Sequence, residues 1–91
     1  MINQIVIVGR INSMTSYGFT IKVMTPDSGK DAREIVLPVH ITDKMQDNVK
    51  NYLEDGCLVG VKGHFDISGK TKKPIMIGDK ITFLSSKGGD D

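Results

Sequence analysis

Apolar positions divide the chain into five short runs rich in β-branched residues and one run with helical spacing. Strands alternate apolar and polar side chains, whereas an amphipathic helix repeats its apolar residues every three or four positions. The pattern predicts strands over residues 2–11, 19–24, 34–41, 57–67 and 75–84. It predicts a helix over residues 44–53, where Met45, Val49 and Leu53 form a narrow apolar stripe. Thr42 or Asp43 can cap that helix.

Glycine and proline mark the expected bends. Gly9 predicts a bulge in the first strand, and Gly78 with Asp79 predicts a bulge or corner in the last. Residues 12–16 and 26–31 are turn-like in composition, and Gly56 is expected to end the helix with a positive φ. Pro38 predicts an edge, a bulge or a bend in the third strand, because proline donates no ladder hydrogen bond.

The predicted order is β-β-β-α-β-β within 84 residues, an all-β fold with one short helix. One helix between the third and fourth strands of a glycine-cornered sheet is the pattern of a five-stranded OB-fold barrel. An SH3-like barrel is the nearest alternative, but it usually lacks a three-turn helix there. We expect one OB-fold domain over residues 1–84 and a short, polar, flexible tail over residues 85–91.

Length and composition exclude several classes of protein. A chain of 91 residues forms one small domain, and no apolar run approaches the roughly 18 residues of a membrane span. Cys57 is the only cysteine, which excludes an internal disulfide and a cysteine zinc cluster. Two isolated histidines make no metal site, and Ser68 to Thr71 lacks the spacing of a phosphate-binding loop. We expect a cytoplasmic protein with no membrane partner, no metal, no cofactor and no catalytic residue.

Three segments resemble a known family. Residues 1–11 (MINQIVIVGRI) are similar to the opening strand of bacterial and phage-type single-stranded DNA-binding proteins. Residues 48–65 (NVKNYLEDGCLVGVKGHF) resemble their helix end and fourth strand, and residues 78–84 (GDKITFL) resemble their closing strand. Together the segments cover more than a third of the chain, in the expected order.

The resemblance implies an OB-fold that coats single-stranded DNA without sequence specificity during replication, recombination or repair. It also implies a homodimer or homotetramer, contacts with replication proteins and an association with the nucleoid. Shortened phage and mobile-element versions are common in the family, and this chain is short. The family stacks bases on aromatic side chains at the end of the third strand and in the hairpin between the fourth and fifth strands, but the aligned positions here hold Thr42 and Lys70.

Binding a single strand requires cations for the phosphates and aromatic rings for the bases. The formal net charge is only +1, but basic residues gather in the two loops that border the binding face of an OB-fold. The alternative is that these lysines only keep the surface soluble. Tyr17 is the best stacking candidate, whereas Phe19, Phe65, Ile67 and Phe83 are interpreted as core. The candidate DNA-binding residues are Lys70, Lys72, Lys73, Lys30, Arg33, Lys22, Lys62, Arg10, Tyr17 and His40.

The first strand is apolar on both faces, which favours pairing with a second copy. One face carries the predicted oligomer contacts Ile2, Gln4, Val6 and Val8. The alternative is that the helix covers this face. The missing aromatics and the nearly neutral charge also leave a second function open. In that case the chain is an OB-fold accessory protein with weak DNA affinity that acts through protein contacts, in replication restart or as a subunit-mimicking inhibitor.

Overall fold

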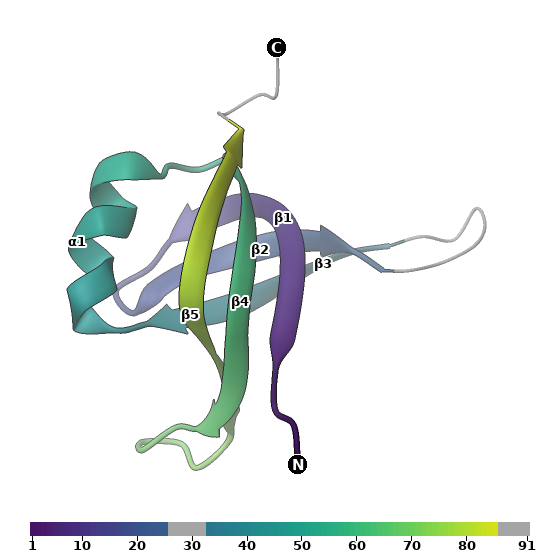
Figure 1. Ribbon diagram of the computed structural model, residues 1–91, viewed down its shortest axis with the longest axis vertical. Helices are drawn as coiled ribbons and strands as arrows, with labels where there is room; N and C mark the ends of the chain where they lie inside the picture. Colours follow the sequence, from purple (N-terminus) through teal and green to yellow (C-terminus); the bar gives the residue numbers. More distant parts are fainter. Residues whose placement is uncertain (26–32, 86–91) are drawn as a thin grey trace.

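The computed structural model describes residues 1–25 and 33–85. Its elements are β1 (Ile5–Met14), β2 (Gly18–Met24), β3 (Glu34–Ile41), α1 (Asp43–Tyr52), β4 (Leu58–Ile67) and β5 (Pro74–Ser85) (Figure 1). The predicted order of five strands and one helix is confirmed. No helix within these ranges is long and apolar enough to cross a membrane.

The strands form a closed barrel in the order β1-β2-β3-β5-β4. All neighbours are antiparallel except β3 and β5, which run parallel. This last pairing joins only His40 to Ile77 and Ile41 to Gly78. The predicted five-stranded OB-fold barrel is therefore confirmed, with its closure resting on a two-residue contact.

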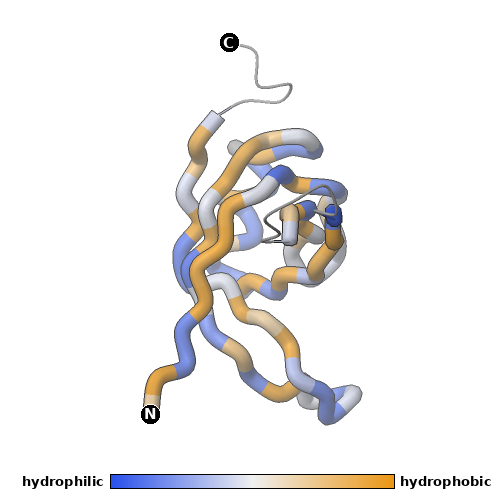
Figure 2. Tube along the Cα trace, turned by 90° about the vertical axis from the view of Figure 1, so that its right-hand side faces the viewer, coloured by the Kyte–Doolittle hydropathy of each residue, from blue (hydrophilic) through white to orange (hydrophobic). Residues whose placement is uncertain are grey.

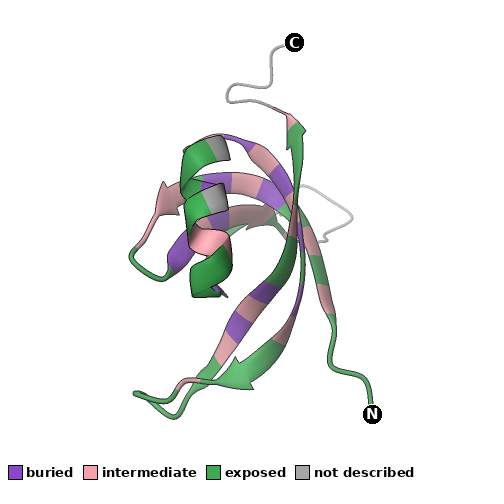
Figure 3. Cartoon of the chain, turned by 60° about the vertical axis from the view of Figure 1, so that its left-hand side comes forward, coloured by how far each residue is buried: buried purple, intermediate pink, exposed green. Residues whose placement is uncertain are grey.

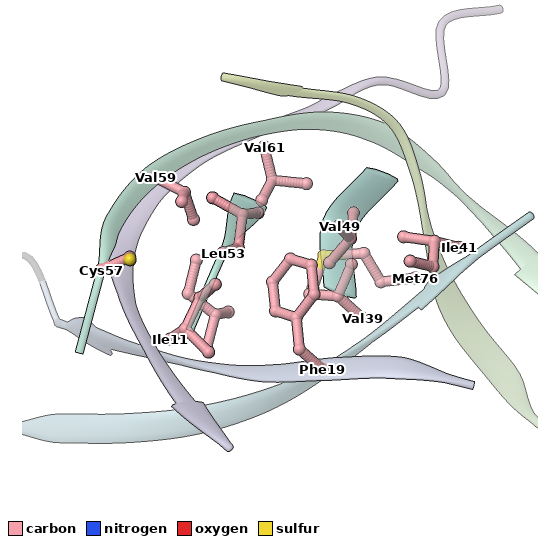
Figure 4. Close-up of a cluster of buried hydrophobic side chains, with 11 residues drawn as sticks. Ile11, Phe19, Val39, Ile41, Val49, Leu53, Cys57, Val59, Val61 and Met76 are labelled. Atoms are coloured by element: carbon pink, nitrogen blue, oxygen red, sulfur yellow. The ribbon is translucent and has the colours of Figure 1, made fainter. Parts of the chain in front are cut away.

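Inward-facing residues of the strands make the core (Figure 4). Phe19 and Ile21 of β2, Val39 of β3 and Val59 of β4 are completely buried. Val49 of the helix α1 and Leu53 at its C-cap belong to the same cluster, so that this segment covers one end of the barrel. The interpretation of Phe19 as a core residue is confirmed. This packing leaves the outer face of the barrel free to bind.

The ends of the helix differ in detail from the prediction. The helix begins one residue earlier, at Asp43, and ends at Tyr52. Thr42 occupies the N-cap position, but its side chain makes no capping hydrogen bond. Gly56 has a positive φ of 92° in the turn that follows the helix, four residues beyond its end. It allows the chain to reverse into β4 without ending the helix itself.

The first strand was predicted wrongly at both ends. It begins at Ile5 and runs to Met14, because residues 13 and 14 pair with β2 instead of forming a turn. The irregularity lies at Asn12, between Ile11 and Ser13, and not at Gly9. Gly9 pairs regularly with β4. A glycine is required at this position because β2 passes close to it. A Cβ there would collide with the carbonyl oxygen of Lys22 in β2.

The last two strands form a long hairpin that extends beyond the barrel. The predicted bulge is confirmed: Asp79 is the extra residue, and its carboxylate contacts the His64 ring at 2.7 Å. Phe65, Ile67 and Phe83 are exposed, so their interpretation as core was wrong. Alternation assigned Phe65 and Ile67 to the inward face of β4, but the end of the hairpin projects from the barrel and is exposed (Figure 3).

We predict that Gly63→Ala destabilises the barrel. An added Cβ would collide with the Ile77 carbonyl, a backbone group that cannot shift without breaking the β4–β5 pairing. Overpacking of this kind lowers the free energy of unfolding by about 1–3 kcal/mol. Each kcal/mol should lower the Tm, followed by circular dichroism, by roughly 4–8 °C.

Gly69→Ala is the matched control, because nothing lies within 4 Å of a Cβ at that position. Its stability should stay within about 0.5 kcal/mol of the parent. Equal Tm values for the two variants would contradict the close approach of β5 to Gly63.

Candidate nucleic-acid interface

Three segments that are distant in sequence enclose a groove on the surface of the barrel. They are the β1–β2 turn, the end of β3 and the β4–β5 hairpin. The groove has a volume of about 450 Å³. We call it the hairpin groove, and it is lined by Ser16, Tyr17, His40, Ser68, Gly69, Lys70 and Ile75. The structure thus brings together three of the candidate residues, Tyr17, His40 and Lys70.

The Tyr17 and His40 rings are stacked, with their centroids 4.3 Å apart and their planes inclined by 21°. The backbone holds both rings in place. The Ile41 amide donates to the Tyr17 carbonyl at 3.0 Å, and the Thr15 amide donates to the Gly18 carbonyl at 3.0 Å. Gly18 is required because a Cβ there would collide with the backbone of β3. The groove therefore presents a preformed aromatic surface next to a lysine.

The β4–β5 turn holds its lysines on a backbone with its own hydrogen bonds. The Ser68 hydroxyl accepts from the amides of Lys70 and Thr71 at 3.2 and 3.3 Å. The Ser68 amide donates to the Lys73 carbonyl at 2.9 Å, and the Lys72 amide donates to the Ser68 carbonyl at 3.0 Å. All three lysine side chains are exposed. The turn is an ordered support for three cations at the edge of the hairpin groove.

A second basic area lies on the outer face of β1 and β2. Arg10 and Lys22 are register partners on these neighbouring strands and line one hollow of about 390 Å³. The Arg10 guanidinium donates a hydrogen bond to the Gly56 carbonyl at 2.9 Å, and among the described residues its other N–H groups have no hydrogen-bond partner. Glu34 lies 4.0 Å from the Lys22 ammonium and partly offsets the positive charge.

Between the two basic areas, the outer face of the barrel is uncharged. Asn12 donates to the Thr20 hydroxyl at 3.2 Å, and the Ser13 hydroxyl lies 3.0 Å from the same oxygen. On β3, Pro38 pairs with Thr20, and the exposed Val36 pairs with Lys22. A single strand can therefore cross a polar and apolar surface with cations at both ends.

Three further candidate residues belong to neither basic area: Lys62 and Arg33 lie elsewhere on the surface, and Lys30 is not among the described residues. Lys62 is on the outer face of β4, opposite Lys80 and beside Val6 and Val8. Arg33 is exposed beyond the start of β3, where its backbone pairs with Thr25. Lys30 lies outside the described residues.

The chemistry of the hairpin groove is that of its lining side chains. Its lining holds a phenol, an imidazole, two hydroxyls and an ammonium group, which suit bases and phosphates. Within residues 1–25 and 33–85, no group of three His, Cys, Asp or Glu side chains is placed to hold a metal ion. The sequence analysis missed Ser16, Ser68 and Ile75. Of these three, only Ser68 is marked by a sequence signal, because a serine in a turn can accept hydrogen bonds from the backbone amides that follow it.

The fold is shared with proteins that are named for binding single-stranded DNA. The sequence itself matches no protein-family model and no curated protein. Among solved structures, the chain is similar to mitochondrial single-stranded DNA binding proteins from S. cerevisiae, Rim1. For one crystal form of Rim1 the TM-score is 0.65 at 19% sequence identity, and the alignment covers 94% of this chain and 98% of the Rim1 chain. In another it is 0.60 at 19% identity, covering 100% of both. This likeness shows that the chain has the same barrel fold, over essentially its whole length.

Proposed function

We propose that the protein binds single-stranded DNA without sequence specificity, along the outer face of β1, β2 and β3 and into the hairpin groove. The observation that carries the proposal is the stacked Tyr17–His40 pair beside Lys70 on this barrel. Rings and cations side by side are what nonspecific single-strand binding requires, because every base has a π face and every nucleotide has a phosphate. The similar Rim1 structures are of proteins named for this ligand.

The balance of forces predicts binding that depends strongly on salt. Stacking contributes roughly 1–3 kcal/mol per base, and the outer face offers a single aromatic pair. Phosphate contacts must then supply much of the affinity. Four or five of them, at about −0.7 each, give a slope of log affinity against log salt near −3.

The cellular role follows from the sequence resemblance. We propose that the protein coats single strands during replication, recombination or repair, in contact with replication proteins and the nucleoid. A bacterial or phage origin of this type of chain is supported by the three segments at residues 1–11, 48–65 and 78–84. The proposed activity is binding, with no chemical step and no cofactor.

An exposed apolar strand supports assembly into a homodimer or homotetramer. Val6 and Val8 are 70% and 56% exposed on the outer face of β1, and Ile2 and Gln4 precede them with exposed side chains. In Figure 2 the tube from the N-terminus is hydrophobic along the first half of β1. Among residues 1–25 and 33–85, the segment 5–8 pairs only with β4, so within this part of the chain its other edge is available to a second strand. The helix packs on the core and leaves Val6 and Val8 uncovered.

The same surface favours a second candidate function. An exposed apolar strand and the absence of aromatics at Thr42 and Lys70 fit an OB-fold accessory protein that acts through protein contacts. Such a protein would serve replication restart or mimic the subunit of another oligomer. It would bind DNA weakly, whereas the first proposal requires tight binding at low salt. The DNA measurements below therefore separate the two functions.

We expect the double variant K72E/K73E to bind single-stranded DNA at least about tenfold more weakly, because two attractive contacts become repulsive. The slope of log affinity against log salt should fall by about 1.4, or 0.7 for each phosphate contact. The measurement is fluorescence anisotropy of labelled oligo-dT of about 35 nucleotides, which spans several OB folds at roughly 4–16 nucleotides each.

The double variant K44E/K50E on α1 is the charge-matched control for K72E/K73E, since both lysines are exposed on the helix. It should change the affinity little. Duplex DNA of equal length should bind more weakly than the single strand. If the parent shows no affinity for oligo-dT at low salt, DNA binding is wrong and the protein-contact function is favoured.

Tyr17→Ala should weaken binding by roughly 5- to 150-fold, the equivalent of about 1–3 kcal/mol for one lost base stack. Tyr17→Phe keeps the ring that stacks on His40 and should retain most of the affinity. The same anisotropy titration measures both variants. Equal affinities for the alanine and phenylalanine variants would show that Tyr17 does not stack on bases.

Val8→Asp should lower the molar mass in solution, because an unpaired carboxylate in an apolar interface is costly to desolvate. Sedimentation equilibrium of the parent should give two or four times the chain mass of 10.0 kDa. Lys44→Asp, an exposed position on α1, is the control and should leave the mass unchanged. A parent that sediments as a monomer would overturn the proposed assembly.

A further inference from the structure

The barrel wall has a gap where β3 and β5 separate. The two strands share only two register pairs, His40–Ile77 and Ile41–Gly78. Before these pairs, Leu37 and Pro38 of β3 are not paired with Pro74 and Ile75 of β5. The two prolines have no N–H to donate across this gap. Between the strands lies a cleft of about 380 Å³, within the size range of small-molecule sites. The β3–β5 cleft, as we call it, is lined by Ile5, Ile7, Leu37, Pro38, Phe65, Pro74, Ile75 and Met76.

Phe65 is the one aromatic ring in this lining, and it is 55% exposed. Its backbone is held firmly. The Asn3 side chain donates to the Phe65 carbonyl at 2.8 Å and accepts from the Phe65 amide at 2.9 Å. These two bonds join Asn3 to Phe65, two residues beyond the last β1–β4 register pair, Ile5 and Gly63. The ring is therefore presented to the cleft from a backbone that is already ordered.

The cleft adjoins the hairpin groove. Ile75 lines both, and Pro38 and His40 lie on the same outer face of β3, two residues apart. Lys73, the last cation of the hairpin turn, directly precedes Pro74 at the edge of the cleft. A strand that lies along the hairpin groove therefore passes the mouth of an apolar cleft.

The apolar β3–β5 cleft suits the base of a nucleotide, and the neighbouring lysines of the hairpin turn suit its phosphate. Every side chain that lines the cleft is apolar, so a phosphate would lose its hydration there without gaining a partner. A base offers two π faces, which can pack on Phe65 and on the aliphatic wall. The lysines of the hairpin turn remain available for the phosphates on either side of that base.

We propose that the β3–β5 cleft receives a base of the bound single strand, with Phe65 as its stacking platform. The proposal rests on the proposed single-stranded DNA binding and adds a second base site to it. The lining offers no hydrogen-bonding side chain, so the cleft accepts purines and pyrimidines alike. It also explains why a small domain keeps a phenylalanine exposed on the inward face of β4.

Phe65→Ala tests the proposal, and Phe83→Ala is its matched control. Phe83 is 52% exposed on the neighbouring strand and lies outside the cleft lining. We expect Phe65→Ala to weaken binding of labelled oligo-dT by roughly 5- to 150-fold, the cost of one base stack. Phe83→Ala should bind like the parent. Thermal melting of both variants checks that the change reflects the ligand and not loss of the fold.

The salt dependence separates a stacking role from an electrostatic one. Phe65→Ala should leave the slope of log affinity against log salt unchanged, because it removes no phosphate contact. Lys70→Ala, by contrast, should reduce the slope by about 0.7. If Phe65→Ala changes this slope, the substitution alters the phosphate contacts. The loss of affinity would then not be evidence for a base site in the cleft.

Photochemical cross-linking locates the base directly. Oligo-dT that contains 5-iodouracil is irradiated with the parent protein, and the modified peptides are mapped by mass spectrometry. We expect one cross-linked peptide that contains Phe65 and another that contains Tyr17. A map with the Tyr17 peptide alone would overturn the cleft proposal while leaving single-stranded DNA binding intact.

The outcomes distinguish the cleft from the proposed function. If the parent binds no single strand, both proposals fail. If the parent binds and Phe65→Ala matches Phe83→Ala, only the cleft proposal fails. If Phe65→Ala lowers the sedimentation mass and leaves the affinity per chain unchanged, the cleft holds a second copy of the protein, and the base site is wrong.

Discussion

The short parallel contact between β3 and β5 is the interaction on which the rest of this barrel depends. It consists of His40 with Ile77 and Ile41 with Gly78, and it is the pairing that closes the sheet. It also fixes the backbone of His40, whose ring stacks on Tyr17. Where the contact ends, the strands separate and the β3–β5 cleft opens. A single closure thus places the aromatic pair and the apolar cleft next to each other.

A domain this small has few apolar side chains with which to build its core. Large apolar side chains that remain exposed on its surface therefore require an explanation. Chains of this size bury only about 60% of the surface that they expose when unfolded. Yet Val6, Val8, Phe65 and Phe83 are each more than half exposed, while Phe19 is the one aromatic ring among the buried residues of the described core. Large apolar groups on a surface favour a binding partner. We assign Val6 and Val8 to a second copy and Phe65 to a base.

The sequence predicted the fold well because the fold depends on local patterns. The β-branched runs identified the five strands, Phe19 was correctly interpreted as core, and the helix between β3 and β4 identified the barrel. The errors arose where distant segments decide the structure. Gly9 was interpreted as a bulge, but it is small because β2 passes close to it. Phe65 was interpreted as core, because alternation gives the direction of a side chain and not the presence of a strand above it.

The candidate site was less predictable than the fold for the same reason. Composition identified the lysines of the hairpin turn, and the position of Tyr17 before Gly18 at a strand start suggested exposure. Only the folded chain shows that Tyr17, His40 and Lys70 line one groove and that Lys62 lies on a different face. Pro38 and Pro74 were the available signals for the cleft. Two prolines on neighbouring strands reduce the hydrogen bonds that can hold those strands together.

The proposed base sites would reconcile the sequence resemblance with the missing aromatics at Thr42 and Lys70. Stacking requires a ring that is exposed, fixed and close to the phosphates, and it does not require a particular position in the alignment. Tyr17 and His40 meet this requirement through the β2–β3 pairing, and Phe65 meets it through the two hydrogen bonds with Asn3. Two base sites at roughly 1–3 kcal/mol each would restore about 2–6 kcal/mol of binding energy. The loss of rings at Thr42 and Lys70 therefore does not by itself argue against single-strand binding, because the same barrel presents other rings beside the same cations.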